Sequence, residues 1–478
     1  MTMQTASLVV GFILAASAMP LPGQTTAEEH AGRAVQFVHE GNLKSAEGEL
    51  RKAVELSPND PALLTSLGGV LGMEGDLRQA NVYLGKAVKL NPEDAASRRN
   101  LAANQWQLGR LKEAHENLDR LLHVNPQDKA ATFLLGMVSE KEKDYSHCVK
   151  LLESVPDVIE RQPDGWAALA SAYYHTNRRE DGHKALQRVV SSPANARSLF
   201  TAGQVAMDAG DFVMAEVLFN GARQGYPDPA AANFQLSLAQ YRGGHAAESA
   251  RTLREAAQAG HAHAEAYVLL CKILSDQKTD TAALQAATEG AQAFPASYEL
   301  VSSKAALEMK LQYFNAAVAS YEKAAKLKPE SPETKRDLAT AQWRAGMREQ
   351  SVATFEAAIL QFPRNALLYQ FYGTLLLEEG SPEGRPKAVG LFEKAITLDD
   401  SSIEARYQLA NIELEDGKPE QALPYLERAI KTDPKDSRLH YTASRVYRRL
   451  LRSSDADREM EIYQKLKAAE QPAAGSQR

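Results

Sequence analysis

The sequence predicts an all-α protein, a solenoid of about thirteen helix-turn-helix units, from three observations. The segment Gly41–Asp60 returns in similar form as Gly75–Asp94 and again as Gly109–Asp128, each time 34 residues further on. Within each unit the apolar residues recur at helical spacing in two runs, with a glycine turn between the runs and often a proline after the second. The proportions of 44% hydrophobic and 24% charged residues are those of soluble globular domains.

Residues 1–23 have the pattern of a secretory signal peptide. Ala6–Met19 carries no charge, Pro20 follows it, and Ala16–Ala18 offers small residues for cleavage. The run is shorter than the roughly 20 residues of a membrane-spanning helix, although no Lys or Arg precedes Arg33 as a signal peptide usually requires. We expect an exported chain, periplasmic or secreted, with no membrane span after processing. Anchoring by an uncleaved N-terminal segment is the alternative.

The repeat frame covers residues 27–470 and leaves residues 471–478 as an expected disordered tail. One step is 33 residues instead of 34, and one is 37, where Ser381–Gly384 lengthens a turn. The expected first residues of the units are Ala27, Pro61, Ala95, Lys129, Pro163, Ala196, Ala230, Ala264, Tyr298, Pro332, Ala366, Ile403 and Ser437. We expect one helical hairpin per unit, and a helix over residues 458–469 that caps the array.

Small residues at two fixed positions predict how the two helices of a unit pack. The eighth position holds only Ala, Gly, Ser or Cys in every unit, and so does the twentieth. Larger side chains such as Leu50, Leu84, Phe219 and Phe392 occupy the twenty-fourth position. The small residues let the backbones approach closely, and the large ones fill the remaining space.

With these features the chain resembles the tetratricopeptide-repeat family, which has the same period of 34 residues. The best matches to the family pattern are Trp166, Leu169, Ala170 and Tyr173, followed in the next unit by Ala215, Phe219, Ala222 and Pro227. The resemblance implies a right-handed superhelix that binds another protein on its concave inner surface. In this family the inner surface is built mainly from positions 2, 5, 9, 12 and 13 of each first helix.

The resemblance predicts a groove rich in aromatic and methionine side chains on the third to seventh units. The residues that it places there are Trp106, Phe133, Met137, Tyr174, Phe200, Gln204, Met207, Phe234, Tyr241 and Arg242, with Arg99, Gln107 and His175 as polar neighbours. Such a groove suits an extended peptide or a helix. For each aromatic residue the alternative is packing between adjacent repeats. We expect replacement of Phe200, Phe234 and Tyr241 together by alanine to abolish partner capture without loss of helicity.

Two further features stand out in the repeats. The arginines Arg445, Arg448, Arg449 and Arg452 beside Tyr441 suit an acidic partner segment, with a solvated face as the alternative. In the eighth unit, Asp280, Ala287 and Gly290 stand where neighbouring units carry larger residues, which predicts a softer joint.

No catalytic, cofactor or metal site is predicted. Cys148 and Cys271 occupy small-residue positions four units apart, so we expect buried free thiols. His261, His263 and Glu265 form the one metal-like cluster, and it lacks a fourth ligand. No nucleotide-binding or nucleophile motif appears. With 55 Lys and Arg against 61 Asp and Glu, the formal net charge of −6 argues against nucleic acid as a partner.

The sequence therefore predicts a non-catalytic scaffold that binds a protein or peptide segment in its concave groove. One alternative is an accessory subunit of a cell-envelope assembly or a polysaccharide-export complex. The other is an enzyme or a glycan-binding protein that uses the same groove. The repeats themselves do not identify the partner.

Overall fold

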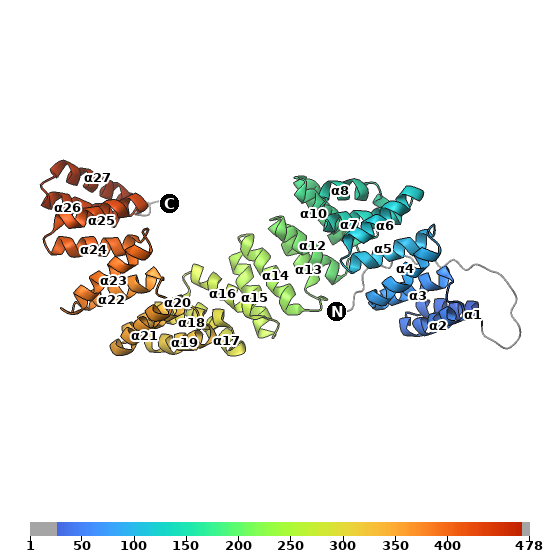
Figure 1. Cartoon of the computed structure of the whole chain (residues 1–478), viewed down its shortest axis with the longest axis horizontal. Coiled ribbons are helices and arrows are strands. Elements are labelled where there is room, and N and C mark those ends of the chain that lie inside the picture. The colour runs from blue at the N-terminus through green and yellow to red at the C-terminus, as the bar shows by residue number, and fades with distance from the viewer. Residues whose placement is uncertain (1–25, 471–478) are drawn as a thin grey trace, which may run out of the picture. The chain divides into compact units, whose positions relative to one another are not determined.

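The computed structural model describes residues 26–470. These residues form 27 helices and no strand, which confirms the predicted all-α class (Figure 1). The chain divides into two compact units, which we call unit 1, up to His263, and unit 2, from Ala264 onward.

Unit 1 consists of antiparallel helix pairs that follow one another along the chain, with one short extra helix (Figure 1). Its helices are α1 (Ala27–His39), α2 (Leu43–Leu56), α3 (Pro61–Glu74), α4 (Leu77–Leu90), α5 (Ala95–Gln107), α6 (Leu111–Val124), α7 (Lys129–Lys141), α8 (Tyr145–Glu153), α9 (Pro156–Ile159), α10 (Pro163–His175), α11 (Arg179–Ser191), α12 (Ala196–Asp208), α13 (Phe212–Ala222), α14 (Pro229–Arg242) and α15 (Ala246–Gln258).

Unit 2 has the same organisation without an extra helix. Its helices are α16 (Ala264–Asp276), α17 (Asp280–Ala293), α18 (Tyr298–Lys310), α19 (Phe314–Leu327), α20 (Pro332–Arg344), α21 (Arg348–Gln361), α22 (Ala366–Glu379), α23 (Gly384–Leu398), α24 (Ile403–Glu415), α25 (Pro419–Thr432), α26 (Ser437–Arg449) and α27 (Ser453–Glu470).

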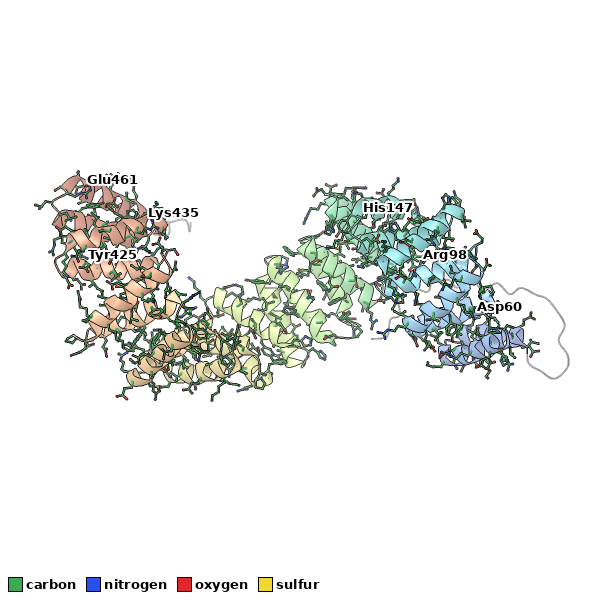
Figure 2. All side chains as sticks on the ribbon, in the orientation of Figure 1. Asp60, Arg98, His147, Tyr425, Lys435 and Glu461 are labelled. Carbon is green, nitrogen blue, oxygen red and sulfur yellow. The ribbon has the colours of Figure 1, made fainter. Side chains whose placement is uncertain are left out.

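Local sequence determines where a helix begins and ends, and α3 illustrates both signals. Asp60, labelled in Figure 2, accepts a hydrogen bond from the backbone N–H of Ala62 at 2.8 Å, and Pro61 is the first helical residue. Gly75 ends the helix with a φ of +88°, a left-handed conformation that glycine adopts without a steric penalty.

The predicted contact between small and large positions is observed in the helix pairs. A Cβ atom added at Gly68 would lie 2.5 Å from Cγ of Leu84, and one added at Gly203 would lie 2.7 Å from Cε1 of Phe219. Both large side chains are buried almost completely. Where the small residue is serine, its hydroxyl group is satisfied: Ser249 Oγ donates to the backbone oxygen of Ser237 at 2.7 Å.

Two expected elements differ from the structure. The fourth unit is not a simple hairpin, because α8 ends at Glu153 and Pro156 begins the one-turn helix α9. Ile159 of α9 is buried and fills the space that a longer α8 would occupy. The expected terminal cap over residues 458–469 is part of α27, which begins at Ser453 and forms the last pair with α26.

The softer joint expected in the eighth unit, α16 and α17, stays a prediction. The packing of this unit gives a physical reason for it. Tyr267 of α16 fills the space at Gly290, where an added Cβ atom would lie 2.8 Å from the tyrosine Cβ. The other buried residues of α17 are alanines, which bury little apolar area. We therefore expect faster native-state hydrogen exchange in α17 than in α13, which buries Leu218 and Phe219. Equal protection of the two helices would contradict this.

Candidate functional site

The structure buries part of the predicted groove. Phe133, Met137, Phe200 and Met207 are each 7% exposed and belong to one hydrophobic cluster that runs through unit 1 from α7 to α14. The ring of Phe200 stacks on Tyr226 at 4.0 Å and meets the edge of Phe219 at 5.3 Å. For these four residues the packing role is the one observed, because the neighbouring helices and loops of the cluster cover them.

Because Phe200 is buried, the triple alanine variant of Phe200, Phe234 and Tyr241 would change the stability of unit 1 as well as partner binding. Removing the ring of Phe200 opens a cavity in the core of unit 1, so the expectation of unchanged helicity does not hold for a variant that includes it. A test of partner binding needs residues that remain accessible.

The other predicted groove residues keep contact with solvent. Trp106, Tyr174, Phe234 and Tyr241 are half-buried, whereas Gln204 and Arg242 are exposed. The Tyr174 hydroxyl donates to Asp211 at 2.8 Å, so that side chain is directed toward α13. Among the polar neighbours, Arg99 forms an ion pair with Asp128 at 2.8 Å, and His175 stacks on Tyr145 at 4.0 Å. The accessible stripe of Phe234, Tyr241 and Arg242 on α14 is the part of the predicted groove that remains; we call it the α14 stripe.

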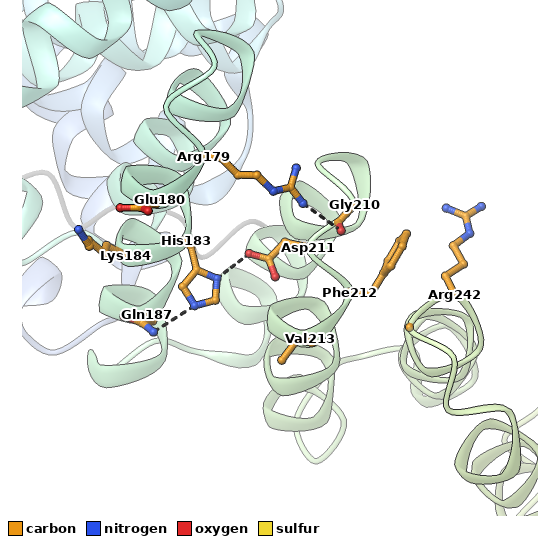
Figure 3. Close-up of a pocket in the computed structure, with 11 residues that line it drawn as sticks. Arg179, Glu180, His183, Lys184, Gln187, Gly210, Asp211, Phe212, Val213 and Arg242 are labelled. Atoms are coloured by element: carbon orange, nitrogen blue, oxygen red, sulfur yellow. Dashed lines mark hydrogen bonds and ion pairs between the residues drawn. The ribbon is translucent and has the colours of Figure 1, made fainter.

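A hollow of about 820 Å³ lies between α11, the turn before α13, and the end of α14 (Figure 3). Its lining residues are Arg179, Glu180, His183, Lys184, Gln187, Gly210, Asp211, Phe212, Val213, Arg242 and Gly243. Of the predicted site residues it contains Arg242 alone. Three successive units build it, so no pattern within one unit could have predicted it. The one available signal was apolar Val217 at an outward position where the flanking helices carry Lys184 and Arg251.

Asp211 organises the hollow through hydrogen bonds to three donors. Its carboxylate accepts from His183 Nδ1 at 2.6 Å, from the Tyr174 hydroxyl at 2.8 Å and from the backbone N–H of Met214 at 3.3 Å. Burial opposes ionisation, but these hydrogen bonds outweigh it and lower the pKa of Asp211. Burial and the bond to Asp211 raise the pKa of Tyr174. The Gln187 amide lies 3.1 Å from His183 Nε2, so both ring nitrogens of this histidine already have partners.

The cationic residues of the hollow differ in whether they form hydrogen bonds or ion pairs within the protein. Arg179 donates to the backbone oxygens of Ala209 at 2.9 Å and Gly210 at 3.2 Å, which holds the turn before α13. Lys184 and Arg242 have no ion-pair partner among residues 26–470. Figure 3 shows them on opposite sides of the hollow, with Phe212 on the side of Arg242.

The four predicted arginines near the C-terminus have different surroundings. Arg452 pairs with Asp455 at 2.7 Å and lies over the Tyr447 ring. Arg445 lies 6.0 Å from the centroid of the Tyr441 ring. Arg448 and Arg449 are exposed in the last turn of α26, where the negative end of the helix dipole favours cations without any partner.

Both cysteines are buried free thiols, as predicted. Burial raises the pKa of Cys148 and of Cys271 to about 12. We expect neither thiol to react with a disulfide reagent such as DTNB near neutral pH while the chain is folded, and both to react in urea. Rapid reaction of one thiol in the native chain would contradict the burial.

The histidine-rich loop does not assemble a metal site. His261 and His263 are exposed, and His263 Nε2 lies 3.8 Å from one carboxylate oxygen of Asp228. Within residues 26–470 no group of three or more His, Cys, Asp or Glu side chains could hold a metal ion. In the same range no helix is both long and apolar enough to cross a membrane.

Comparison with family models identifies the repeats. One tetratricopeptide-repeat model matches residues 73–135 and 376–446, and a second matches residues 301–331. The chain therefore contains tetratricopeptide repeats. No curated protein matches the chain significantly.

Solved structures of similar fold share little sequence with it. Yeast Tom70 is 14% identical, with 93% of this chain and 92% of Tom70 covered at a TM-score of 0.41. The Cut9–Hcn1 structure from the APC/C is 12% identical, with 93% and 94% covered at a TM-score of 0.37. PilF of Pseudomonas aeruginosa is 20% identical over 42% of this chain and 92% of PilF, with a TM-score of 0.35. At these values the likeness carries no inference about partners.

Proposed function

We propose that this protein is a non-catalytic scaffold that binds a segment of another protein on the α14 stripe and the neighbouring exposed residue Gln204. The observation that carries the proposal is that Phe234 and Tyr241 are only partly buried and lie on the same helix as exposed Arg242. The core side of α14 is already filled by Leu236, Ser237 and Ala239. Aromatic side chains next to an arginine are the residue types that dominate binding energy at protein interfaces.

The rival enzyme function has less support from the residues of the hollow. His183 is the one histidine there, and both of its ring nitrogens face Asp211 and Gln187. No serine, cysteine or threonine lines the hollow to act as a nucleophile. A glycan could stack on Phe234 and Tyr241 instead of a peptide, and competition between peptides and sugars for the purified chain separates these two ligands.

Crosslinked pull-down from the native compartment, followed by mass spectrometry, tests the scaffold function. We expect Phe234→Ala combined with Tyr241→Ala to remove the captured partner while helicity stays unchanged. The matched control is Tyr313→Ala combined with Leu360→Ala, because both residues are exposed and lie in unit 2. Equal capture by the two double variants would contradict binding on the α14 stripe.

We also propose that the chain is exported, with an accessory role in a cell-envelope assembly or a polysaccharide-export complex as one possible setting. The N-terminal segment on which export depends lies outside the described residues. N-terminal sequencing of the chain recovered from expressing cells tests export. We expect a mature chain that begins close to residue 20, whereas an intact Met1 on a cytoplasmic chain would contradict it.

A further inference from the structure

The hollow of unit 1 carries positive charge that the protein itself does not neutralise. Its three cations, Arg179, Lys184 and Arg242, face the two carboxylates of Glu180 and Asp211. Asp211 already accepts hydrogen bonds from three donors, and Lys184 and Arg242 have no ion-pair partner among residues 26–470.

Two other cations close to the hollow have ion-pair partners. Arg178 precedes α11 and forms ion pairs with Glu153 at 2.9 Å and with Asp181 at 2.8 Å. Arg223, which follows α13, lies 3.6 Å from Glu255. A carboxylate supplied from outside would give Lys184 and Arg242 the charged partner that neither has.

An apolar wall stands beside these cations. Phe212 is half-buried, Val213 is 65% exposed, and Val217 continues the same face one turn along α13 at 46% exposed. The position of Val217 corresponds to Lys184 in α11 and to Arg251 in α15, and the position of Val213 corresponds to Glu180 and Ala247. Two exposed valines one turn apart, where three of the four equivalent residues are charged, favour contact with an apolar side chain.

The hollow is also preformed, which lowers the entropic cost of binding. Arg179 holds the turn before α13 through two backbone oxygens, and Gly210 in that turn has a φ of +68°. Asp211 caps α13 and fixes the orientation of His183 at the same time. Lys184 and Phe212 therefore project from elements that are already rigid.

We propose that this hollow binds an acidic segment of the partner, with one acidic side chain at Lys184, another at Arg242, and a neighbouring apolar side chain against Phe212 and Val213. This inference rests on the proposed scaffold function and names the chemistry of its partner. The occupant is a separate protein, because residues 1–25 and 471–478 of this chain contain no Asp or Glu.

Selection of peptides by the full chain tests this proposal. A phage-displayed library of random dodecapeptides is panned in parallel against the wild-type chain and against a Lys184→Gln, Arg242→Gln variant. We expect peptides that only the wild-type chain enriches to share two acidic residues, Asp or Glu, with a neighbouring apolar residue. The matched control is Lys150→Gln with Arg254→Gln, two exposed cations of unit 1 outside the hollow, which should enrich the same peptides as wild type.

A second measurement tests the carboxylate directly. For an enriched peptide, fluorescence anisotropy should show binding to the wild-type chain that weakens about tenfold when one of its acidic residues becomes the corresponding amide, the size of one lost charged hydrogen bond. The same affinity should fall as salt is raised. Thermal melting of the Lys184→Gln, Arg242→Gln variant should match wild type, because neither side chain has a partner to lose.

The outcomes separate the two proposals. Enrichment of peptides that bind the hollow variant as tightly as wild type, or that share no acidic residue, would overturn the role of the hollow and leave the scaffold function standing. Failure of the wild-type chain to enrich any peptide would contradict the scaffold function itself.

Discussion

Replacing Phe219 by alanine is expected to destabilise unit 1 by about 3–5 kcal/mol, the usual cost of deleting a fully buried phenylalanine ring. This ring is 0% exposed, fills the space above Gly203 and meets the edge of Phe200. Urea unfolding followed by circular dichroism measures the loss as a lower midpoint.

Two control variants make that result specific to the contact between small and large residues. Val217→Ala on the same helix removes a side chain that is 46% exposed, and surface changes of this kind usually stay within about 0.5 kcal/mol. Gly203→Ala combined with Phe219→Leu recreates the pair formed by Ala34 and Leu50, and should lose less stability than Phe219→Ala alone. An equal loss in the double variant would contradict the packing explanation.

Replacing Asp211 by alanine is expected to be the next most damaging change. It leaves His183 and Tyr174 without their acceptor and removes the cap of α13, and buried hydrogen bonds to a charged group contribute roughly 1.5–3 kcal/mol. Asp211→Asn is the matched control because asparagine also caps a helix but carries no charge. We expect it to retain part of the stability that alanine loses.

Acid titration separates the charge of Asp211 from its capping role. Its pKa is lower in the folded chain than in the unfolded chain, so its charge stabilises the fold above the ordinary Asp pKa of about 3.9 and this contribution disappears as the pH falls through the folded value. The stability difference between wild type and Asp211→Asn should therefore shrink on acidification. A difference that stays constant down to acid unfolding would contradict the assignment.

The helices and their internal packing were predictable because both depend on residues close together in sequence. The cap at Asp60, the left-handed Gly75 and the fit of Gly203 under Phe219 each involve one helix or one pair. Pro156 was also visible in the sequence, and as a helix breaker it could have indicated the short α8 followed by α9.

The accessible surface was not predictable in the same way. Whether Phe200 faces a partner or the core depends on which residues of the following helix and loop lie against it, and its stacking on Tyr226, in the loop after α13, buries it in the core. The hollow combines Lys184, Asp211 and Arg242 from three successive units, whose relative placement no single repeat encodes.

Hydrogen–deuterium exchange of the full chain, with and without a peptide that the chain has enriched, tests most directly whether this protein acts by binding a partner segment. We predict slower exchange on binding in α14 and in the turn before α13, with α17 unchanged. Unchanged exchange in α14 and in that turn at saturating peptide would contradict the proposed site and, with it, the function assigned to the chain.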